Sequence, residues 1–299
     1  MAINIIITGA NSQLAKAISY ACHYKQFSSL HLSFLTKEQL DITNEDNVTK
    51  TLEILNPDFV INTAAIHDLA YCEKHKREAG SVNVTGVYNL FNACNRINAK
   101  LVQISSDYVF GEKTSRIPPR PFKEEDPCYP MNYYGLTKAW GENIVLSNDN
   151  NYVVRISSLF SQWGSRSKNN TNFVLSMIKR VAQQDDIRVV NDVIMSPTFA
   201  VHAAVNILSL IKDDMPGGIY HANNGGECSW YDFTMYLFAL MNVKIPVKAI
   251  QSHELPSESQ WPKRPRYSAL DNSKIQSIGI FVPTWQEALE EYVKMRDKQ

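Results

Sequence analysis

Short apolar runs rich in β-branched residues alternate with helical segments through the first 160 residues of this 299-residue chain. Such runs are typical of strands buried on both faces, each followed by a helix that returns the chain across a sheet. The predicted strands lie at 3–8, 30–35, 58–62, 100–105 and 152–156, and the predicted helices at 12–24, 45–55, 69–98 and 131–146. Because such crossovers are right-handed, the pattern predicts an α/β fold with a doubly wound parallel sheet of the Rossmann type.

The segment TGANSQLA at residues 8–15 follows the first predicted strand and opens the first predicted helix. A dinucleotide-binding loop at this place carries glycines for a tight turn, for close approach of the backbone to pyrophosphate, and for helix packing. Only one glycine, Gly9, is present here. We interpret the loop as altered but functional, with the Ser12 hydroxyl capping the helix and donating to phosphate.

The alternating pattern loosens after about residue 160, although 173–182 and 201–211 are still predicted to be helical. We expect residues 1–160 to form a dinucleotide-binding domain whose core strands continue into later residues. Residues 161–299 are expected to form mainly a smaller C-terminal substrate-binding lobe, interleaved with the sheet.

Composition limits the classes of partner that the chain is expected to bind. The 30 basic residues balance 30 acidic ones, so no net charge attracts nucleic acid or a membrane surface. No apolar stretch approaches the roughly 20 residues of a membrane-spanning helix, and a strand predicted from residue 3 leaves no room for a signal peptide. Five scattered cysteines and seven histidines show no metal-ligand spacing. We therefore expect no metal site, reduced thiols and a cytoplasmic location.

Two further segments suggest acid–base chemistry. Ser106 lies at the carboxyl end of the fourth predicted strand, where doubly wound folds bind their ligands. Tyr134 and Lys138 are four residues apart in a predicted helix, so an ammonium would lie beside a phenol and lower its pKa. A turn-capping serine and an ordinary helical Tyr/Lys pair are the structural alternatives. The order of glycine loop, strand-end serine and Tyr-x-x-x-Lys favours catalysis.

Several motifs together identify a family resemblance. They are LDITN (40–44), NPDFVINTAA (56–65), VNVTG (82–86), QISSDYVF (103–110), PFKEEDP (121–127), NYYGLTKAWGE (132–142), SPT (196–198), GGIYH (217–221) and RPRYSALDNSK (264–274). With them the chain resembles, nearly end to end, the dTDP-4-dehydrorhamnose reductase family of extended short-chain dehydrogenase/reductases.

The resemblance implies reduction of the 4-keto group of a nucleotide-linked 6-deoxyhexose by NADPH or NADH, in deoxysugar and surface polysaccharide biosynthesis. Tyr134 would be the proton donor. Lys138 would hold the nicotinamide ribose and lower the pKa of the tyrosine. Ser106 would orient the substrate carbonyl and stabilise the charge that develops on its oxygen.

The resemblance also implies binding residues. Those for the cofactor are Gly9, Asn11, Ser12, Gln13, Leu14, Thr36, Lys37, Asp41, Ile42, Ala64, Ala65 and Ile66, together with Tyr134 and Lys138. Those for the substrate are Ser106, Asp107, Ser158, Asn172 and Arg264. Thr36 and Lys37 stand where an acidic residue would hold the ribose 2′-hydroxyl. Lys37 could pair with a 2′-phosphate, which favours NADPH, and a solvated surface lysine is the alternative.

The chain departs from the family pattern on the substrate side. Ser158 stands where relatives carry tryptophan, Val193 and Met195 replace glutamine and glycine, and Ala70 replaces an aspartate. These changes are consistent with compensated divergence or with a different sugar or nucleotide, and both alternatives leave Ser106, Tyr134 and Lys138 in place.

Two other functions remain open at the level of sequence. One is a non-catalytic subunit resembling the methionine adenosyltransferase regulatory subunit, which the intact catalytic residues oppose. The other is a nucleotide-sugar epimerase or dehydratase, but a dehydratase typically adds acidic residues where Tyr108 follows Asp107 here. Because the family includes monomers and metal-linked dimers, the resemblance also leaves a homodimer open.

Overall fold

A six-stranded parallel sheet forms the centre of the computed structural model, which describes residues 2–112, 119–165, 170–183, 186–256 and 261–297. The strand order is β10-β5-β4-β3-β1-β2. The strands are β1 (Ile3–Thr8), β2 (Leu30–Leu35), β3 (Phe59–Asn62), β4 (Lys100–Ser106), β5 (Tyr152–Ile156) and β10 (Gly218–His221). The predicted doubly wound parallel sheet is confirmed.

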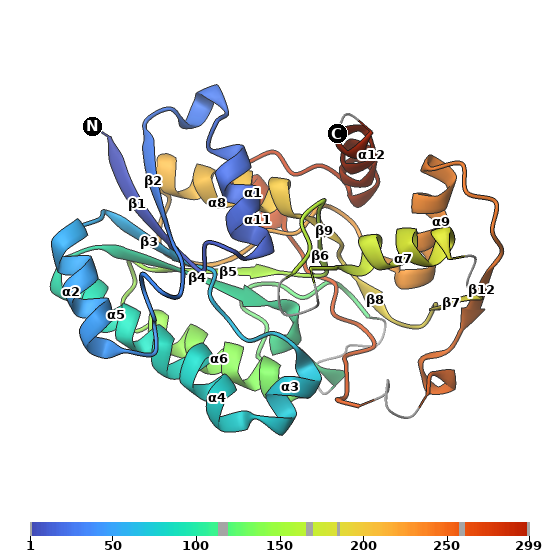
Figure 1. The fold of residues 1–299 in the computed structure, drawn as a ribbon, viewed down its shortest axis with the longest axis horizontal. Coiled ribbons are helices and arrows are strands. Elements are labelled where there is room, and N and C mark those ends of the chain that lie inside the picture. Colours follow the sequence, from blue (N-terminus) through green and yellow to red (C-terminus); the bar gives the residue numbers. More distant parts are fainter. Residues whose placement is uncertain (1, 113–118, 166–169, 184–185, 257–260, 298–299) are drawn as a thin grey trace.

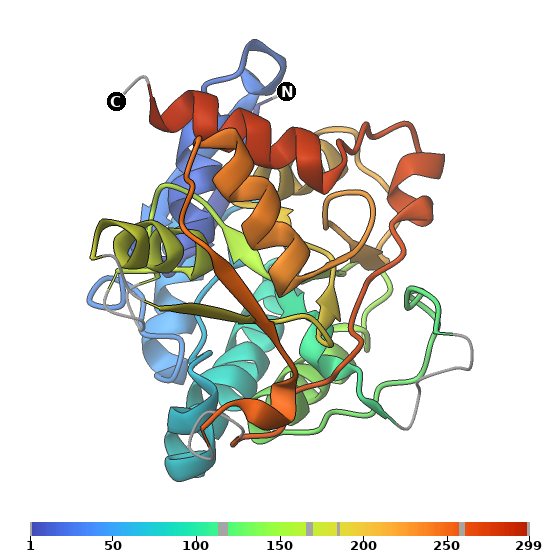
Figure 2. The ribbon, with the colours of Figure 1, turned by 90° about the vertical axis from the view of Figure 1, so that its right-hand side faces the viewer.

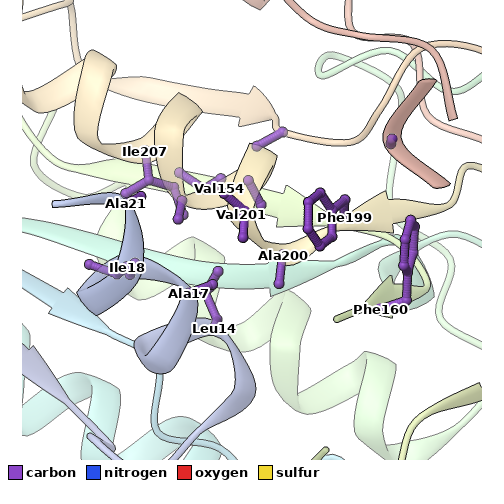
Figure 3. Close-up of a cluster of buried hydrophobic side chains, with 14 of the residues drawn as sticks. Leu14, Ala17, Ile18, Ala21, Val154, Phe160, Phe199, Ala200, Val201 and Ile207 are labelled. Atoms are coloured by element: carbon purple, nitrogen blue, oxygen red, sulfur yellow. The ribbon is translucent and has the colours of Figure 1, made fainter. Parts of the chain in front are cut away.

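Helices cover both faces of the sheet (Figure 1). One face carries α2 (Glu45–Leu55), α5 (Gly86–Arg96) and α6 (Tyr133–Val145), and the other carries α1 (Gln13–Ala21), α8 (Ala200–Lys212) and α11 (Ser273–Ser277). Figure 3 shows the largest core cluster, where side chains of α1 such as Ala17 and Ile18 face Val201 and Ile207 of α8. These side chains are buried, and this packing fixes α1 over the sheet.

The predicted helix 69–98 is not continuous. It consists of α3 (Leu69–Lys74), α4 (Lys76–Gly80), a π-helical turn η2 (Ser81–Thr85) and α5. The break after α3 lies at His75, whose φ of −120° and ψ of 53° are not helical. Apolar periodicity predicts a helical stretch. It does not show where one residue within that stretch leaves the helical conformation, or where the stretch contains a π turn.

The second half of the chain builds a lobe beside the carboxyl edge of the sheet (Figures 1 and 2). It contains α7 (Phe173–Ala182) and α9 (Trp230–Leu240), with β7 (Ile187–Val190) paired in parallel to β12 (Val247–Ile250). Two further short pairs join β8 (Ile194–Met195) to β11 (Cys228–Ser229) and β6 (Leu159–Phe160) to β9 (Thr198–Phe199). The remaining elements are α12 (Trp285–Arg296), η1 (Lys25–Phe27), η3 (Asp107–Val109) and η6 (Ser252–Glu254). Because α8 and β10 also come from this half, it contributes to the central sheet and its helical layer.

Within the described ranges, no helix combines the length and the apolar character that crossing a bilayer requires. The same residues contain no group of three or more His, Cys, Asp or Glu side chains placed to hold a metal ion. The five cysteines all lie in described segments and are free thiols.

Candidate active site

A cleft of about 1610 Å³ lies at the carboxyl edge of the sheet and extends into the C-terminal lobe. It opens where the chain leaves β1 and β3 in opposite directions, the point at which doubly wound sheets bind ligands. Every predicted cofactor-binding, catalytic and substrate-binding residue lines this cleft. The topology therefore brings together residues that lie far apart in the chain, from Gly9 near its start to Arg264 in its second half.

Gly9 shapes the loop between β1 and α1. Its φ is +64°, and a Cβ built on it would lie 3.0 Å from the backbone nitrogen of Ala64 after β3. A side chain at this position would be strained and would push β1 and β3 apart. Gly9 is therefore the glycine that this loop requires.

Ser12 faces the neighbouring strand end. Its Oγ accepts a hydrogen bond from the backbone N–H of Ala15 at 3.0 Å and lies 2.8 Å from Oγ1 of Thr63. The hydroxyl of Thr63 donates to the carbonyl of Thr8 at 2.6 Å, so Ser12 supplies the hydrogen between the two side chains. The predicted helix cap is confirmed. In this arrangement the hydroxyl hydrogen of Ser12 is directed at Thr63, and its donation to phosphate stays a prediction.

The entrance to α1 fits the pyrophosphate of a dinucleotide. The first turn of α1 presents free backbone N–H groups, which favour an anion. Nε2 of the buried Gln13 has no hydrogen-bond partner among the described residues. A buried donor of this kind suits a phosphate oxygen, since an unmade hydrogen bond is costly. Asn11 and Leu14 line the cleft on either side of it.

The segments after β2 and β3, which carry further predicted cofactor residues, also line the cleft. Thr36 and the exposed Lys37 follow β2 at the cleft rim. Burial acts to raise the pKa of Asp41, but hydrogen bonds from Thr43 and the charge of Lys37 outweigh it and lower that pKa. Ile42 is buried against Gly86 of α5.

Asn83 fixes the backbone at Ile66. Its Oδ1 accepts from the Ile66 N–H at 2.9 Å and its Nδ2 donates to the Ile66 carbonyl at 2.8 Å. The same Nδ2 donates to Oγ1 of Thr137, which lies in α6 between Tyr134 and Lys138. The π-helical turn η2 thus connects the cofactor segment 64–66 to the helix of the predicted catalytic residues.

Tyr134 lies beside Ser106 because α6 begins very close to η3. A Cβ on Gly135 would lie 2.1 Å from the carbonyl oxygen of Tyr108, so only glycine permits this approach. The rings of Tyr108 and Tyr134 meet edge to face with centroids 6.0 Å apart. Ser106 and Tyr134 both line the cleft at this point.

The pKa of Tyr134 is raised and not lowered as predicted. Burial is the main cause, and the negative charge of Asp107 adds to it, while the hydrogen bond with Ser106 opposes both. The ammonium of Lys138 is directed elsewhere, since Nζ donates to the carbonyl of Ile104 at 2.5 Å. Without a strong effect of this ammonium, desolvation dominates and favours the neutral phenol.

Lys138 is itself buried. Desolvation lowers its pKa to about 8, and the carboxylate of Glu142 opposes this shift from one turn further along α6. An ammonium has three hydrogens. With one on Ile104, two remain for hydroxyl groups of a ligand in the cleft that Lys138 lines.

The predicted substrate-binding residues differ in whether their polar side-chain groups are already hydrogen-bonded within the protein. Both carboxylate oxygens of Asp107 are bound by serine hydroxyls, and both polar groups of the Asn172 side chain cap or hold backbone around α7. These hydrogen bonds hold both side chains within the protein, and their contact with substrate stays a prediction. Ser158 lines the cleft with a φ of +45°, and Arg264 is exposed on its wall.

Sequence reasoning missed four residues that organise the site: Thr63, Asn83, Ser157 and Ser268. The first two lie within the NPDFVINTAA and VNVTG segments or directly beside them, so those motifs carried a signal for them. Ser268 lies within the RPRYSALDNSK segment, but no local pattern pairs it or Ser157 with Asp107, which is 161 and 50 residues away in the chain.

Comparison with known proteins finds relatives that match almost the whole chain. The family described as RmlD substrate binding domain matches residues 3–297. The chain is 32% identical to the spore coat polysaccharide biosynthesis protein SpsK of Bacillus subtilis, over 98% of this chain and 97% of that protein. It is 33% identical to a dTDP-4-dehydrorhamnose reductase of Aggregatibacter actinomycetemcomitans, over 96% of this chain and 97% of that protein.

A solved structure extends the likeness to three dimensions. The dTDP-4-dehydrorhamnose reductase of Bacillus anthracis in complex with NADP superimposes with a TM-score of 0.88 at 32% identity, covering 99% of this chain and 100% of that one. The family match, the sequences and the fold agree over almost the full length, and the chain therefore belongs to the RmlD substrate-binding domain family.

Proposed function

We propose that the chain is an NAD(P)H-dependent reductase of the 4-keto group of a nucleotide-activated 6-deoxyhexose, acting in deoxysugar and polysaccharide biosynthesis. The observation that carries this proposal is the meeting of Ser106, Tyr134 and Lys138 in one cleft with the loop at Gly9. Family membership and the names of the two relatives support it.

The residues of this chain supply binding, orientation and a proton. When bound, the reduced nicotinamide supplies the hydride for the carbonyl carbon. Tyr134 gives its hydroxyl proton to the oxygen of the developing alkoxide, and Ser106 lines the same cleft beside it. The raised pKa of Tyr134 keeps it protonated until the alkoxide forms. The two remaining hydrogens of Lys138 bind the ribose hydroxyls beside the reacting carbon.

The cofactor is NADPH or NADH. The loop at Gly9, the first turn of α1 and the unpartnered amide of Gln13 would hold the pyrophosphate. Lys37 at the cleft rim favours NADPH, because its ammonium can pair with a 2′-phosphate. The exposed guanidinium of Arg264 suits the diphosphate of the substrate, since its planar fork binds two oxygens at once.

The enzyme is proposed to work in the cytoplasm, where thiols such as those of this chain stay reduced. A homodimer is a possible assembly that the family resemblance leaves open beside a monomer. Light scattering of the purified protein would test it: a monomer mass at micromolar concentration would contradict it.

The first experiment is a titration with NADPH and with NADH, followed by nicotinamide fluorescence. We expect micromolar binding, tighter for NADPH, and then turnover of 4-keto-6-deoxy sugar nucleotides. Failure of both cofactors to bind below about 1 mM would contradict the proposal and favour a regulatory role. The ratio of the NADH and NADPH dissociation constants tests the role of Lys37 directly.

Tyr134→Phe tests the assignment of the proton donor. It should lower turnover by about 10²-fold or more and leave the NADPH dissociation constant within about twofold. Tyr88→Phe is the matched control, because Tyr88 is 52% exposed on α5 and does not line the cleft. Wild-type turnover in Tyr134→Phe would contradict the catalytic assignment.

A further inference from the structure

One segment of the C-terminal lobe presents an aromatic ring and two cations to the cleft. Trp261, Lys263 and Arg264 are exposed and line the cleft. Pro262 and Pro265, which alternate with them, are buried. The buried prolines anchor the segment to the protein, while the three exposed side chains stay accessible to a ligand.

Hydrogen bonds fix the backbone of this segment beside the helix that carries Tyr134. The Lys263 carbonyl accepts a hydrogen bond from Nδ2 of Asn132 at 2.9 Å. The Arg266 carbonyl accepts one from the backbone N–H of Ile194 at 2.8 Å. Because Asn132 is the N-cap of α6, two residues before Tyr134, the segment forms a wall of the cleft at its catalytic end.

The side chain of Trp261 remains available in this wall. It is 48% exposed. Among the residues that the structure describes, no aromatic ring or cation packs on its indole and no acceptor receives its N–H. Two residues of chain span at most about 7 Å, so the backbone of Trp261 stays close to that of Lys263. A large planar side chain presented in this way suits contact with a ligand.

A nucleoside diphosphate has the two chemical groups that this segment matches. Its base is flat and stacks on aromatic rings, and its diphosphate attracts ammonium and guanidinium groups. Trp261 supplies the ring, while Lys263 and Arg264 supply the cations. The charge of Arg264 also acts on Tyr108, whose ring meets that of Tyr134. A diphosphate bound at these cations therefore leaves the attached sugar near Tyr134 and the base near Trp261.

We propose that Trp261 is the platform on which the nucleobase of the substrate stacks, while Lys263 and Arg264 hold the diphosphate. This inference rests on the proposed function and names the contact for the part of the substrate that does not react. Stacking uses only the flat face of a base. The platform therefore adds affinity for nucleoside diphosphates without selecting among pyrimidine bases.

Calorimetric titration of the full chain with dTDP, UDP and inorganic pyrophosphate tests this inference, because pyrophosphate lacks a base. In Trp261→Ala we expect the dissociation constants of dTDP and UDP to rise by the same factor, about tenfold or more. Those of pyrophosphate and NADPH should stay within about twofold of wild type, because the cations and the loop at Gly9 are intact. Unchanged dTDP affinity in Trp261→Ala would overturn the inference.

Two further variants separate stacking from a general effect of the substitution. Trp261→Phe keeps an aromatic face and should keep the dTDP dissociation constant within about threefold of wild type. Trp140→Ala is the matched control, because Trp140 is 44% exposed on α6 and does not line the cleft. It should leave dTDP binding unchanged. An equal loss of affinity for dTDP and for pyrophosphate or NADPH in Trp261→Ala would also overturn the inference.

Failure of this inference differs from failure of the proposed function. If the wild type reduces a 4-keto-6-deoxy sugar nucleotide and Trp261→Ala leaves its KM unchanged, the platform is overturned and the reductase is upheld. If the wild type binds dTDP through Trp261 but reduces no such sugar nucleotide, the reductase is overturned and the base contact is upheld. A wild type that neither binds dTDP nor reduces these substrates overturns both.

Discussion

At the scale of single residues, Lys138 limits the pH range of the reaction. Burial lowers its pKa to about 8, so the ammonium is present below that pH and lost above it. We predict that kcat/KM, which reports the free enzyme, falls as the pH rises through about 8. Lys138→Arg keeps a permanent charge, and its residual activity should show no alkaline limb. If kcat/KM of the wild type and of Lys138→Arg fell at the same alkaline pH, this assignment would be contradicted.

Ser12 gives the second prediction at this scale. Its hydroxyl caps α1 and contacts Thr63, so both of its hydrogen-bonding roles lie within the protein. Ser12→Ala should therefore cost about 1 kcal/mol of unfolding free energy, as lost helix caps do, and leave NADPH affinity within about threefold. Urea unfolding and fluorescence titration measure the two effects. A tenfold weaker NADPH affinity without loss of stability would show that the hydroxyl binds the cofactor after all.

At the scale of elements, the contact between α1 and α8 holds the cofactor loop in place. Ala17 is fully buried where α1 packs on α8 (Figure 3), so a larger side chain would push the helices apart. Ala17→Leu should lower the unfolding free energy by about 1–3 kcal/mol, the usual cost of overpacking. Ile54→Ala, at a position 81% exposed on α2, should change it by less than about 0.5 kcal/mol. Equal effects in the two variants would contradict the packing argument.

The elements also show where prediction from sequence succeeds and where it stops. The strands at Ile3–Thr8, Leu30–Leu35 and Tyr152–Ile156 match their predicted bounds, because each is a short run rich in apolar residues between turn or helical segments. The π turn at Ser81–Thr85 was missed, since its side chains continue the apolar pattern of a helix. The direction of the Ser12 hydroxyl was also missed, because a one-dimensional motif does not say which neighbouring strand a side chain meets.

At the scale of the whole molecule, the topology that brings strand ends together was predictable and the contacts between distant segments were not. The rule for doubly wound sheets places Ser106 and Gly9 at one edge. No local pattern pairs Asp107 with Ser268, or Arg155 of β5 with Glu142 of α6, because such pairs depend on the packing of the complete chain. The long-range contacts are therefore the part that only the structure supplies.

Arg155 provides the last prediction. It is 1% exposed and binds both carboxylate oxygens of Glu142, at 2.9 and 2.7 Å, while Nη1 donates to the carbonyl of Glu124. Glu124 in turn accepts the backbone N–H of His221 on β10, so one cluster connects helix, loop and two strands. Arg155→Met leaves the Glu142 charge buried without its partner and should cost about 3 kcal/mol or more in urea unfolding.

The double variant Arg155→Met with Glu142→Gln distinguishes a lost ion pair from a lost packing contact. It removes the stranded charge and keeps an amide that can accept the Ser105 hydroxyl, now 2.5 Å from Oε1 of Glu142. We therefore expect the double variant to recover at least about 1 kcal/mol relative to Arg155→Met alone. If the double variant is as unstable as Arg155→Met, the stranded charge of Glu142 is not the cause of the instability. Arg155 would then stabilise the molecule mainly through its packing.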